Sequence, residues 1–150
     1  MRKHCEVVLV ADNLDNGCSR LDNPEKWKID PQASFLSLCS NETVNGFEMD
    51  LNKFPWQLFP RDMPVAVDMS SNIGTVEVPW DKLGVVYMGS QKNLGTAGCT
   101  VICVREDLLG KAQEDVPILC DWTTHEKSPD TYYNTPAIWP MFVTGLNVSY

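Results

Sequence analysis

Five apolar runs of strand length constrain the fold of this chain more than any other feature. Few polar residues interrupt them and many of their side chains are β-branched, which is typical of strands covered on both faces. Such strands form the mostly parallel sheets of α/β proteins, in which helices pack on both sides. The sequence therefore predicts an α/β fold with strands at 6–11, 34–39, 65–69, 85–88 and 99–104.

The segments between these runs predict more loop than helix. Residues 12–32 and 50–64 are dense in Asn, Asp, Gly and Pro, which favour turns. Helices are predicted at 107–113, with Asp107 as the cap, and at 135–145, which begins with Thr-Pro. Because so few helices cannot cover both faces of a sheet, we expect a sheet that is incompletely covered.

Length, charge and hydropathy exclude several classes of protein. The 150 residues suffice for one domain, and the net charge of −8 disfavours nonspecific binding to nucleic acid or acidic membranes. No apolar run reaches the roughly 18 residues of a membrane span, so no membrane insertion is expected. The apolar run near the amino terminus is also too short for a signal peptide.

The six cysteines predict a reducing compartment, which suggests a cytoplasmic protein. None of them forms a Cys-x-x-Cys pair, and Cys99 and Cys103 would lie roughly 13 Å apart along one strand. This separation excludes a disulfide between them and joint ligation of one zinc ion. His4 and His125 are too far apart in the sequence to suggest a metal site, so no metal is expected.

Polar side chains follow three of the predicted strands. Asp68 ends the third strand, Thr43 lies shortly after the second, and Gln91 and Lys92 follow the fourth. If the sheet is parallel, these residues lie near its carboxyl edge, where open α/β sheets bind ligands. A carboxylate, a hydroxyl and an amine at this edge would form a pocket for an anion and a heterocycle.

Each of these residues also has a structural interpretation. An aspartate at a strand end is more often a turn or cap residue, and a single loop lysine is usually solvated. The glycine-rich turn around Lys92 matches neither the Walker A pattern nor the G-x-G-x-x-G fingerprint. The individual residues therefore leave a structural and a functional interpretation open.

Several motifs, taken in order, resemble the phosphoserine aminotransferase family of class-V, pyridoxal-phosphate-dependent aminotransferases. Several independent motifs in the same order are a far more specific signal than any one of them. The resemblance extends from about residue 32 onward, whereas the first thirty residues match poorly. The motifs are "CSNETVNGFEMD" (39–50), "VDMSSN" (67–72), "GVVYMGSQKNLGTAG" (84–98), "VREDLLG" (104–110) and "YYNTP" (132–136).

The resemblance implies an enzyme with the aspartate aminotransferase-like fold (fold type I), pyridoxal 5′-phosphate as cofactor and a homodimer that shares its active sites. The implied reaction transfers an amino group between L-glutamate and 3-phosphohydroxypyruvate, giving O-phospho-L-serine in serine biosynthesis. Lys92 would be the Schiff-base lysine and acid–base group, Asp68 would pair with the pyridine nitrogen, and Thr43 would bond the 3-oxygen of the ring. Contacts to the cofactor phosphate are implied for Gln91 and, across the dimer, for Asn134 and Thr135.

The same resemblance gives the glycine-rich turn two properties. The apolar strands on both sides of Lys92 predict desolvation of its amine, which would lower its pKa by about 3–5 units and favour the neutral form. Gly89, Gly95 and Gly98 would give the turn the backbone freedom that close approach to a phosphate requires.

We expect residues 1–150 to form a single segment, the central part of the cofactor-binding large domain. On this interpretation the amino-terminal part and the carboxyl-terminal small domain of the family are absent, and Trp27 packs in the core rather than stacking on the cofactor. Two alternatives are a noncatalytic paralogue that pairs with a full-length subunit, and another aminotransferase of fold type I.

Overall fold

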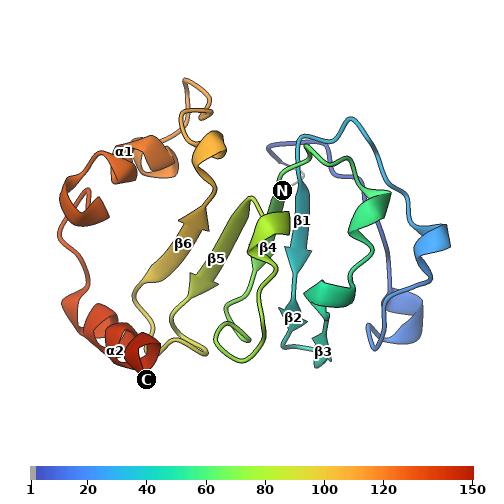
Figure 1. Cartoon of the computed structure of the whole chain (residues 1–150), viewed down its shortest axis with the longest axis horizontal. Coiled ribbons are helices and arrows are strands. Elements are labelled where there is room, and N and C mark those ends of the chain that lie inside the picture. Colours follow the sequence, from blue (N-terminus) through green and yellow to red (C-terminus); the bar gives the residue numbers. More distant parts are fainter. Residues whose placement is uncertain (1–2) are drawn as a thin grey trace.

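The structure, a computed structural model, describes residues 3–150 and contains a four-stranded sheet of order β1-β4-β5-β6 (Figure 1). β1, β4 and β5 are parallel, whereas β6 runs antiparallel to β5. The predicted mostly parallel sheet is therefore confirmed. The strands are β1 Leu36–Cys39, β4 Val65–Asp68, β5 Val85–Gly89 and β6 Thr100–Val104.

The strand predicted at 6–11 is wrong. These residues are not in a strand, and their backbone meets a loop instead, where the amide of Lys28 donates to the carbonyl of Val10 at 2.9 Å. A strand exists only where a neighbouring strand supplies its hydrogen bonds. β1 is an edge of this sheet, so no further strand pairs with its outer side. The apolar run indicated a tendency to be buried but could not indicate a pairing partner.

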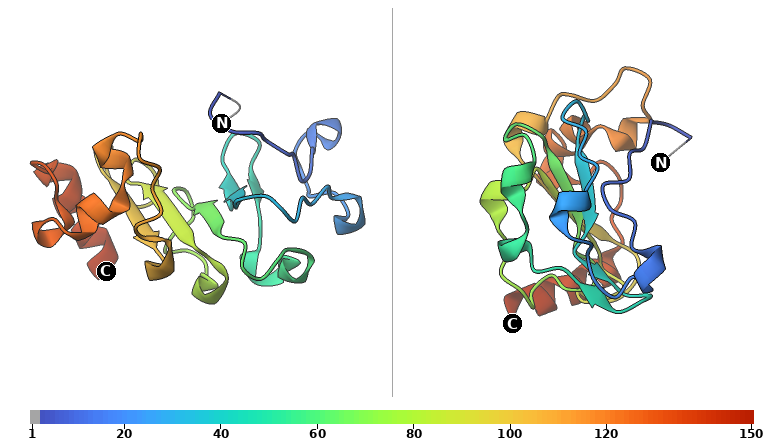
Figure 2. Two further views of the ribbon diagram at one scale, coloured as in Figure 1. Left: turned by 90° about the horizontal axis from the view of Figure 1, so that it is seen from above. Right: turned by 90° about the vertical axis from the view of Figure 1, so that its right-hand side faces the viewer.

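Short turns, one hairpin and two helices make up the rest of the chain. The antiparallel hairpin of β2 Asn41–Glu42 and β3 Phe47–Glu48 follows β1 closely. α1 Trp122–Glu126 and α2 Ile138–Ser149 lie beyond β6, at the end of the sheet opposite to residues 10–30 (Figures 1 and 2). The 3-10 turns are η1 Leu14–Asn16, η2 Pro24–Lys26, η3 Leu51–Lys53, η4 Trp56–Leu58, η5 Trp80–Lys82, η6 Glu106–Leu108, η7 Ile118–Cys120 and η8 Pro129–Thr131.

Both predicted helices differ from the structure at their boundaries. The segment at 107–113 forms only η6, whose cap position is Arg105 rather than Asp107, and Gly110 ends it with a φ of +71°. α2 begins at Ile138 rather than near 135. Pro140 explains the later start. In the first turn of a helix the N–H groups have no intrahelical partner, so a proline there costs no hydrogen bond. If the helix began near 135, Pro140 would lie in its interior and one intrahelical hydrogen bond would be missing.

One face of the sheet packs against the irregular segment at 50–64. Val67 and Val86, register partners on β4 and β5, are 0% and 1% exposed. The ring of Trp27 lies 5.5 Å from that of Phe54 and 6.2 Å from that of Phe59, measured between centroids, so its predicted packing role is confirmed. The other buried members of this core are Leu36, Leu51, Met63, Val65, Met69, Leu83, Met88 and Leu94.

β6 is covered less than the sequence predicted. Val101 and Ile102 are 37% and 44% exposed, and adjacent strand residues point to opposite faces. The expectation of two covered faces is therefore wrong for this strand, while the expected shortage of helices is confirmed. None of the helices in residues 3–150 is long and apolar enough to cross a membrane.

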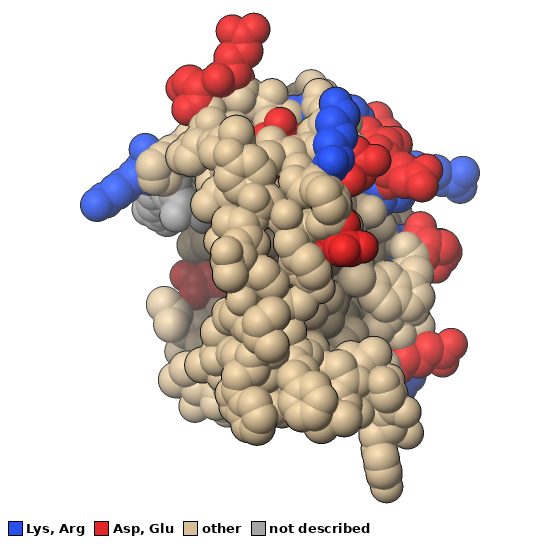
Figure 3. Space-filling model, turned by 90° about the vertical axis from the view of Figure 1, so that its left-hand side faces the viewer, with Lys and Arg blue, Asp and Glu red and all other residues tan. Residues whose placement is uncertain are grey.

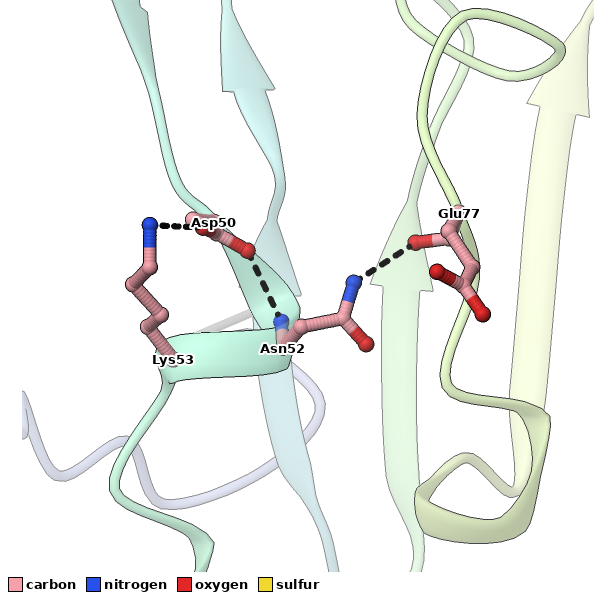
Figure 4. Close-up of polar contacts among 4 residues, drawn as sticks. All are labelled: Asp50, Asn52, Lys53 and Glu77. Carbon is pink, nitrogen blue, oxygen red and sulfur yellow. Dashed lines mark hydrogen bonds and ion pairs between the residues drawn. The ribbon is translucent and has the colours of Figure 1, made fainter.

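Polar contacts tie the irregular segment to the loop that follows β4 (Figure 4). Asp50 caps η3 by accepting a hydrogen bond from the amide of Asn52, and it pairs with Lys53 at 2.9 Å. The side-chain amide of Asn52 donates to the carbonyl of Glu77 at 3.1 Å. The segment that covers the core is thus attached to the sheet at its surface as well.

Candidate functional site

The carboxyl ends of β1, β4 and β5 meet at one edge of the sheet, and this edge is the candidate site. Cys39, Asp68 and Tyr87 are register partners, so their side chains form one row on one face. Val67, next to Asp68, belongs to the core and points to the opposite face. The same strands therefore present the hydrophobic core on one side and this polar row on the other.

The turn after β4 fixes the carboxylate of Asp68. Its Oδ1 accepts hydrogen bonds from the amide of Ser70 at 2.9 Å and from Ser70 Oγ at 2.6 Å. Ser70 Oγ also accepts from the amide of Gly89, at the end of β5, at 2.9 Å. Because a hydroxyl has one proton, and an amide can only donate, the proton of Ser70 is directed to Asp68. Oδ2 of Asp68 takes no part in these bonds.

Lys92 reaches across the edge to the hairpin. Its Nζ donates to Oγ1 of Thr43 at 3.0 Å. Thr43 directly follows β2, and Lys92 lies in the turn that follows β5. The fold thus brings together an amine and a hydroxyl that are 49 positions apart in the sequence.

The predicted burial of Lys92 is wrong, because its side chain is exposed. Apolar and polar groups at the ends of the turn are buried instead. Leu94 is 7% exposed, and Ser90 is 0% exposed, with the single proton of its Oγ shared between the carbonyls of Thr96 and Cys99. The buried strands anchor the turn and leave the lysine at its surface, so the described residues do not supply the expected desolvation.

The glycines of this turn make room for side chains of the same chain. A Cβ on Gly89 would collide with the amide group of Gln91, which folds back over it. Gly98 has a φ of +132°, and a Cβ there would lie 2.6 Å from Cγ of Pro140. Gly98 therefore permits close packing of the turn against α2, a role that the sequence did not indicate.

Asn134 and Thr135 lie elsewhere in the fold. Both are exposed and line a groove beside β6 and α2, together with residues such as Tyr132 and Met141. The structure therefore brings Thr43, Asp68, Gln91 and Lys92 to the carboxyl edge of the sheet, and it places Asn134 and Thr135 beyond β6.

The charges of this edge act on two neighbouring groups. Cys39 is exposed as a residue, but partial burial of its thiol raises the thiol pKa and the charge of Asp68 raises it further. A hydrogen bond with the backbone of Asn41 and the charge of Lys92 oppose this rise. Burial also raises the pKa of the Tyr87 phenol, again with a contribution from Asp68. Cys39 and Asp68 are register partners, and the turn that carries Lys92 follows β5, the strand next to Asp68, so the acid and the amine lie at the same edge.

A carboxylate closes the hairpin turn that carries Thr43. Glu42 accepts hydrogen bonds from the amides of Asn45 at 2.7 Å and Val44 at 2.8 Å. These two bonds, that of Asn45 first, lower the pKa of Glu42, and the positive charge of Lys92 acts in the same direction. The ionised form of Glu42 thus stabilises the turn in which the hydroxyl of Thr43 is held.

The donor set fits pyridoxal 5′-phosphate. Oδ2 of Asp68 is available for a protonated ring nitrogen, since Oδ1 is already bonded to Ser70. Lys92 offers an amine for the aldehyde, and Thr43 offers a hydroxyl beside it for the ring oxygen. An acid and an amine at one sheet edge can together hold a small heterocycle between them.

Sequence reasoning did not single out Cys39, Tyr87 or Ser70. A signal existed for the first two, because aligning the three apolar runs at their carboxyl ends places Cys39 and Tyr87 beside Asp68. Ser70 offered no comparable signal, because its role depends on a contact with Gly89 from another strand.

Comparison with known proteins shows which family this chain resembles. The aminotransferase class-V family model matches residues 1–143, so the match begins at residue 1 rather than near residue 32. A phosphoserine aminotransferase of Vesicomyosocius okutanii subsp. Calyptogena okutanii is 42% identical over 142 residues, covering 94% of this chain and 37% of that protein. One from Chromobacterium violaceum is 36% identical over 148 residues, with coverages of 97% and 39%. The chain therefore spans less than two fifths of the length of these relatives.

Solved structures give the same result for the fold. Phosphoserine aminotransferase from Bacillus circulans subsp. alkalophilus matches with a TM-score of 0.80 and 30% identity, covering 93% of this chain and 37% of that one. The pyridoxal-phosphate-bound enzyme from Trichomonas vaginalis also has a TM-score of 0.80, with 29% identity and coverages of 93% and 39%. The predicted α/β class, as part of fold type I, is confirmed.

Proposed function

The chain belongs to the aminotransferase class-V family, and from this premise we propose that its carboxyl edge is part of the active site of a phosphoserine aminotransferase. The proposed reaction moves an amino group between L-glutamate and 3-phosphohydroxypyruvate and yields O-phospho-L-serine in serine biosynthesis. The observation that carries the proposal is the gathering of Asp68, Lys92 and Thr43 at one edge of the sheet. Identity of 42% to a phosphoserine aminotransferase supports this pair of substrates.

The cofactor of this family is pyridoxal 5′-phosphate, as in the similar structure from Trichomonas vaginalis. When bound, it supplies an aldehyde that bonds to amines and a ring that accepts electrons from the substrate carbon. Asp68 would hold the ring nitrogen through Oδ2, and Thr43 would bond the ring oxygen. Lys92 would bind the aldehyde carbon, and Gln91 would contact the phosphate.

The residues at the edge would then orient the substrate and move one proton. The carboxylate of Asp68, held in place by the Ser70 hydroxyl, would favour a protonated ring nitrogen when the cofactor is bound. Once the substrate amine has displaced it from the aldehyde carbon, Nζ of Lys92 would carry the proton between Cα of the amino acid and that carbon, as a general base and acid. The flexible side chain of Lys92 permits this movement, because its bond to Thr43 lies at the surface.

A second copy of the chain is the proposed partner. The outer side of α2 is apolar, with Trp139 66% and Phe142 56% exposed, and few charged side chains lie over it (Figure 3). Exposed apolar surfaces of this kind mark sites of association. Asn134 and Thr135 line the groove between β6 and α2, and from there they would reach the cofactor phosphate of the other subunit. We place this homodimer in the cytoplasm, where thiols such as Cys99 and Cys103 stay reduced.

A half-reaction tests the proposed function. The chain is incubated with pyridoxal 5′-phosphate and L-glutamate, and 2-oxoglutarate is measured before and after 3-phosphohydroxypyruvate is added. We expect phosphoserine to form from 3-phosphohydroxypyruvate, but neither aspartate from oxaloacetate nor serine from hydroxypyruvate, which lacks the phosphate. The Lys92→Arg variant should form no product, whereas Lys111→Arg, at another exposed lysine, should match the original chain. Equal rates with oxaloacetate would instead indicate another aminotransferase of the same fold.

A further inference from the structure

The turn at residues 69–73, which follows β4, is joined to the turn that carries Lys92. The backbone amide of Asn93 donates to the carbonyl of Ser70 at 3.2 Å. The side-chain amide of Asn93 donates to the carbonyl of Ile73 at 2.5 Å. The position of Lys92 along the edge therefore depends on the turn after β4.

The same turn is joined to the hairpin that carries Thr43. Oγ of Ser71 donates to the carbonyl of Asn41, in β2, at 2.9 Å. The backbone amide of Ser40, just before β2, donates to the carbonyl of Asp68 at 3.0 Å. Both partners of the Lys92–Thr43 contact are thus attached to one short segment.

Asn72 is the buried centre of this segment. It is 2% exposed, its Oδ1 accepts from Oγ of Ser40 at 2.8 Å, and its Nδ2 donates to Oε1 of Glu48 at 2.9 Å. Ser40 is 0% exposed and precedes the first strand of the hairpin, whereas Glu48 belongs to the second. The amide of Asn72 therefore joins both strands of the hairpin to the turn after β4.

The direction of these bonds is fixed by chemistry. The carboxylate of Glu48 can only accept, so the NH₂ group of Asn72 must face it and the carbonyl oxygen must face Ser40. An aspartate at position 72 would keep the bond from Ser40 but would place a carboxylate against that of Glu48. Like charges at hydrogen-bond distance, one of them buried, would separate the hairpin from the turn.

From this network we infer that Asn72 is a positioning residue that sets Thr43 against Lys92. The side chain of Asn72 is hydrogen-bonded to Ser40 and Glu48, and it acts on Thr43 and Lys92 through them. Its importance for the reaction rests on the proposed function, because the inference concerns how the amine is presented at that same site.

The reactivity of Lys92 tests this inference without cofactor. Acetic anhydride is applied over a range of alkaline pH, and acetylation of Lys92 is compared with that of Lys111 in the same molecule by peptide mass spectrometry. Asn72→Asp should raise the relative rate at Lys92 about two- to fivefold, because the bond to Thr43 is lost. Thr43→Val should raise it by the same factor, and combining the two changes should add nothing further.

A second substitution should rescue the first. Glu48→Gln alone should leave Lys92 unchanged, because its side-chain oxygen still accepts from Asn72. In the combination of Asn72→Asp with Glu48→Gln, the new amide donates to the new carboxylate, and the rate at Lys92 should return to its original value. A lower melting temperature for Asn72→Asp with unchanged reactivity of Lys92 would overturn the inference, as would failure of the rescue.

Measurements with pyridoxal 5′-phosphate separate this inference from the proposed function. Asn72→Asp and Thr43→Val should weaken cofactor binding by equal factors, and Glu48→Gln should restore it in the first case. If the cofactor bonds to Lys92 equally well in all variants, the inference is wrong and the function stands. If the anhydride results hold but no variant and no original chain binds the cofactor, the positioning role stands and the proposed function is wrong.

Discussion

The carboxyl edge of the sheet buries polar side chains, whereas the outer surface of α2 leaves large apolar side chains exposed. At the edge, Ser40 and Ser90 are 0% exposed, and both form hydrogen bonds. On α2, Trp139 is 66% exposed while Thr144 is 7% exposed. Burial of polar groups is tolerated only where they are paired, so the edge is a built polar site. Within residues 3–150, the large apolar side chains on the outer surface of α2 remain exposed, which is typical of a contact surface.

The largest expected effect contrasts the core behind the site with this surface. Met69→Ala should lower the free energy of unfolding by about 2–5 kcal/mol, because Met69 is 0% exposed in the core. Phe142→Ala, at a side chain 56% exposed, should change it by less than about 0.5 kcal/mol when the chain is dilute enough to be monomeric. Urea unfolding of the two variants measures both values. Equal losses would show that the α2 surface is buried in solution and would break the comparison.

The next effect concerns the contact between the turn after β5, which contains Gly98, and Pro140 of α2. Gly98→Ala should destabilise the chain by about 1–3 kcal/mol through collision with Pro140, in addition to the strain of its positive φ. Gly110→Ala is the matched control, because its φ is also positive, at +71°, but its Cβ would meet no atom within 4 Å. The midpoint of thermal unfolding should be clearly lower for Gly98→Ala than for Gly110→Ala. The same midpoint for both would mean that the turn does not pack against α2.

The sequence predicted the parts of the fold that depend on local pattern. The apolar runs that became β1, β4, β5 and β6 are strands because their side chains favour a pleated, half-buried surface. The run at 6–11 has the same composition but lacks a neighbouring strand. Pairing is a long-range property, and composition does not contain it.

The candidate site shows the same limit. Asp68 and Lys92 could be predicted as neighbours because parallel strands end at a common edge. The exposure of Lys92 could not, because it depends on how the turn is anchored by Ser90 and Leu94. The positioning role of Asn72 could not be predicted either, since it depends on hydrogen bonds with Ser40 and Glu48, which lie far from it in the sequence.

A smaller effect is expected for the thiol beside Asp68. The pKa of Cys39 is raised above the ordinary 9.0, by burial first and by the charge of Asp68 second. Alkylation of Cys39 by iodoacetamide should therefore have its midpoint above pH 9.0, and Asp68→Asn should move this midpoint down. Peptide mass spectrometry across alkaline pH measures both. A midpoint below 9.0 would place Cys39 away from the acid.

The smallest effect is expected at the exposed hairpin turn. The pKa of Glu42 is lowered below the ordinary 4.5 by its bonds from Asn45 and Val44. The resulting stabilisation is present above pH 4.5 and is lost as the pH falls through the lower folded-state pKa. The protection of these two amides against hydrogen exchange, relative to the intrinsic rate at each pH, should fall over that acidic range, and in Glu42→Gln it should be lower already at neutral pH. Exchange that does not depend on Glu42 would contradict this role.

The central claim is that the amine of Lys92 and the acid of Asp68 face one cofactor at the carboxyl edge. Borohydride reduction of the chain in the presence of pyridoxal 5′-phosphate, followed by peptide mapping, tests it most directly. We expect the pyridoxyl group on Lys92, with Lys111 unlabelled, and a clear loss of label in Asp68→Asn. Label spread over the surface lysines, or label on Lys92 that is unaffected by Asp68→Asn, would contradict the claim.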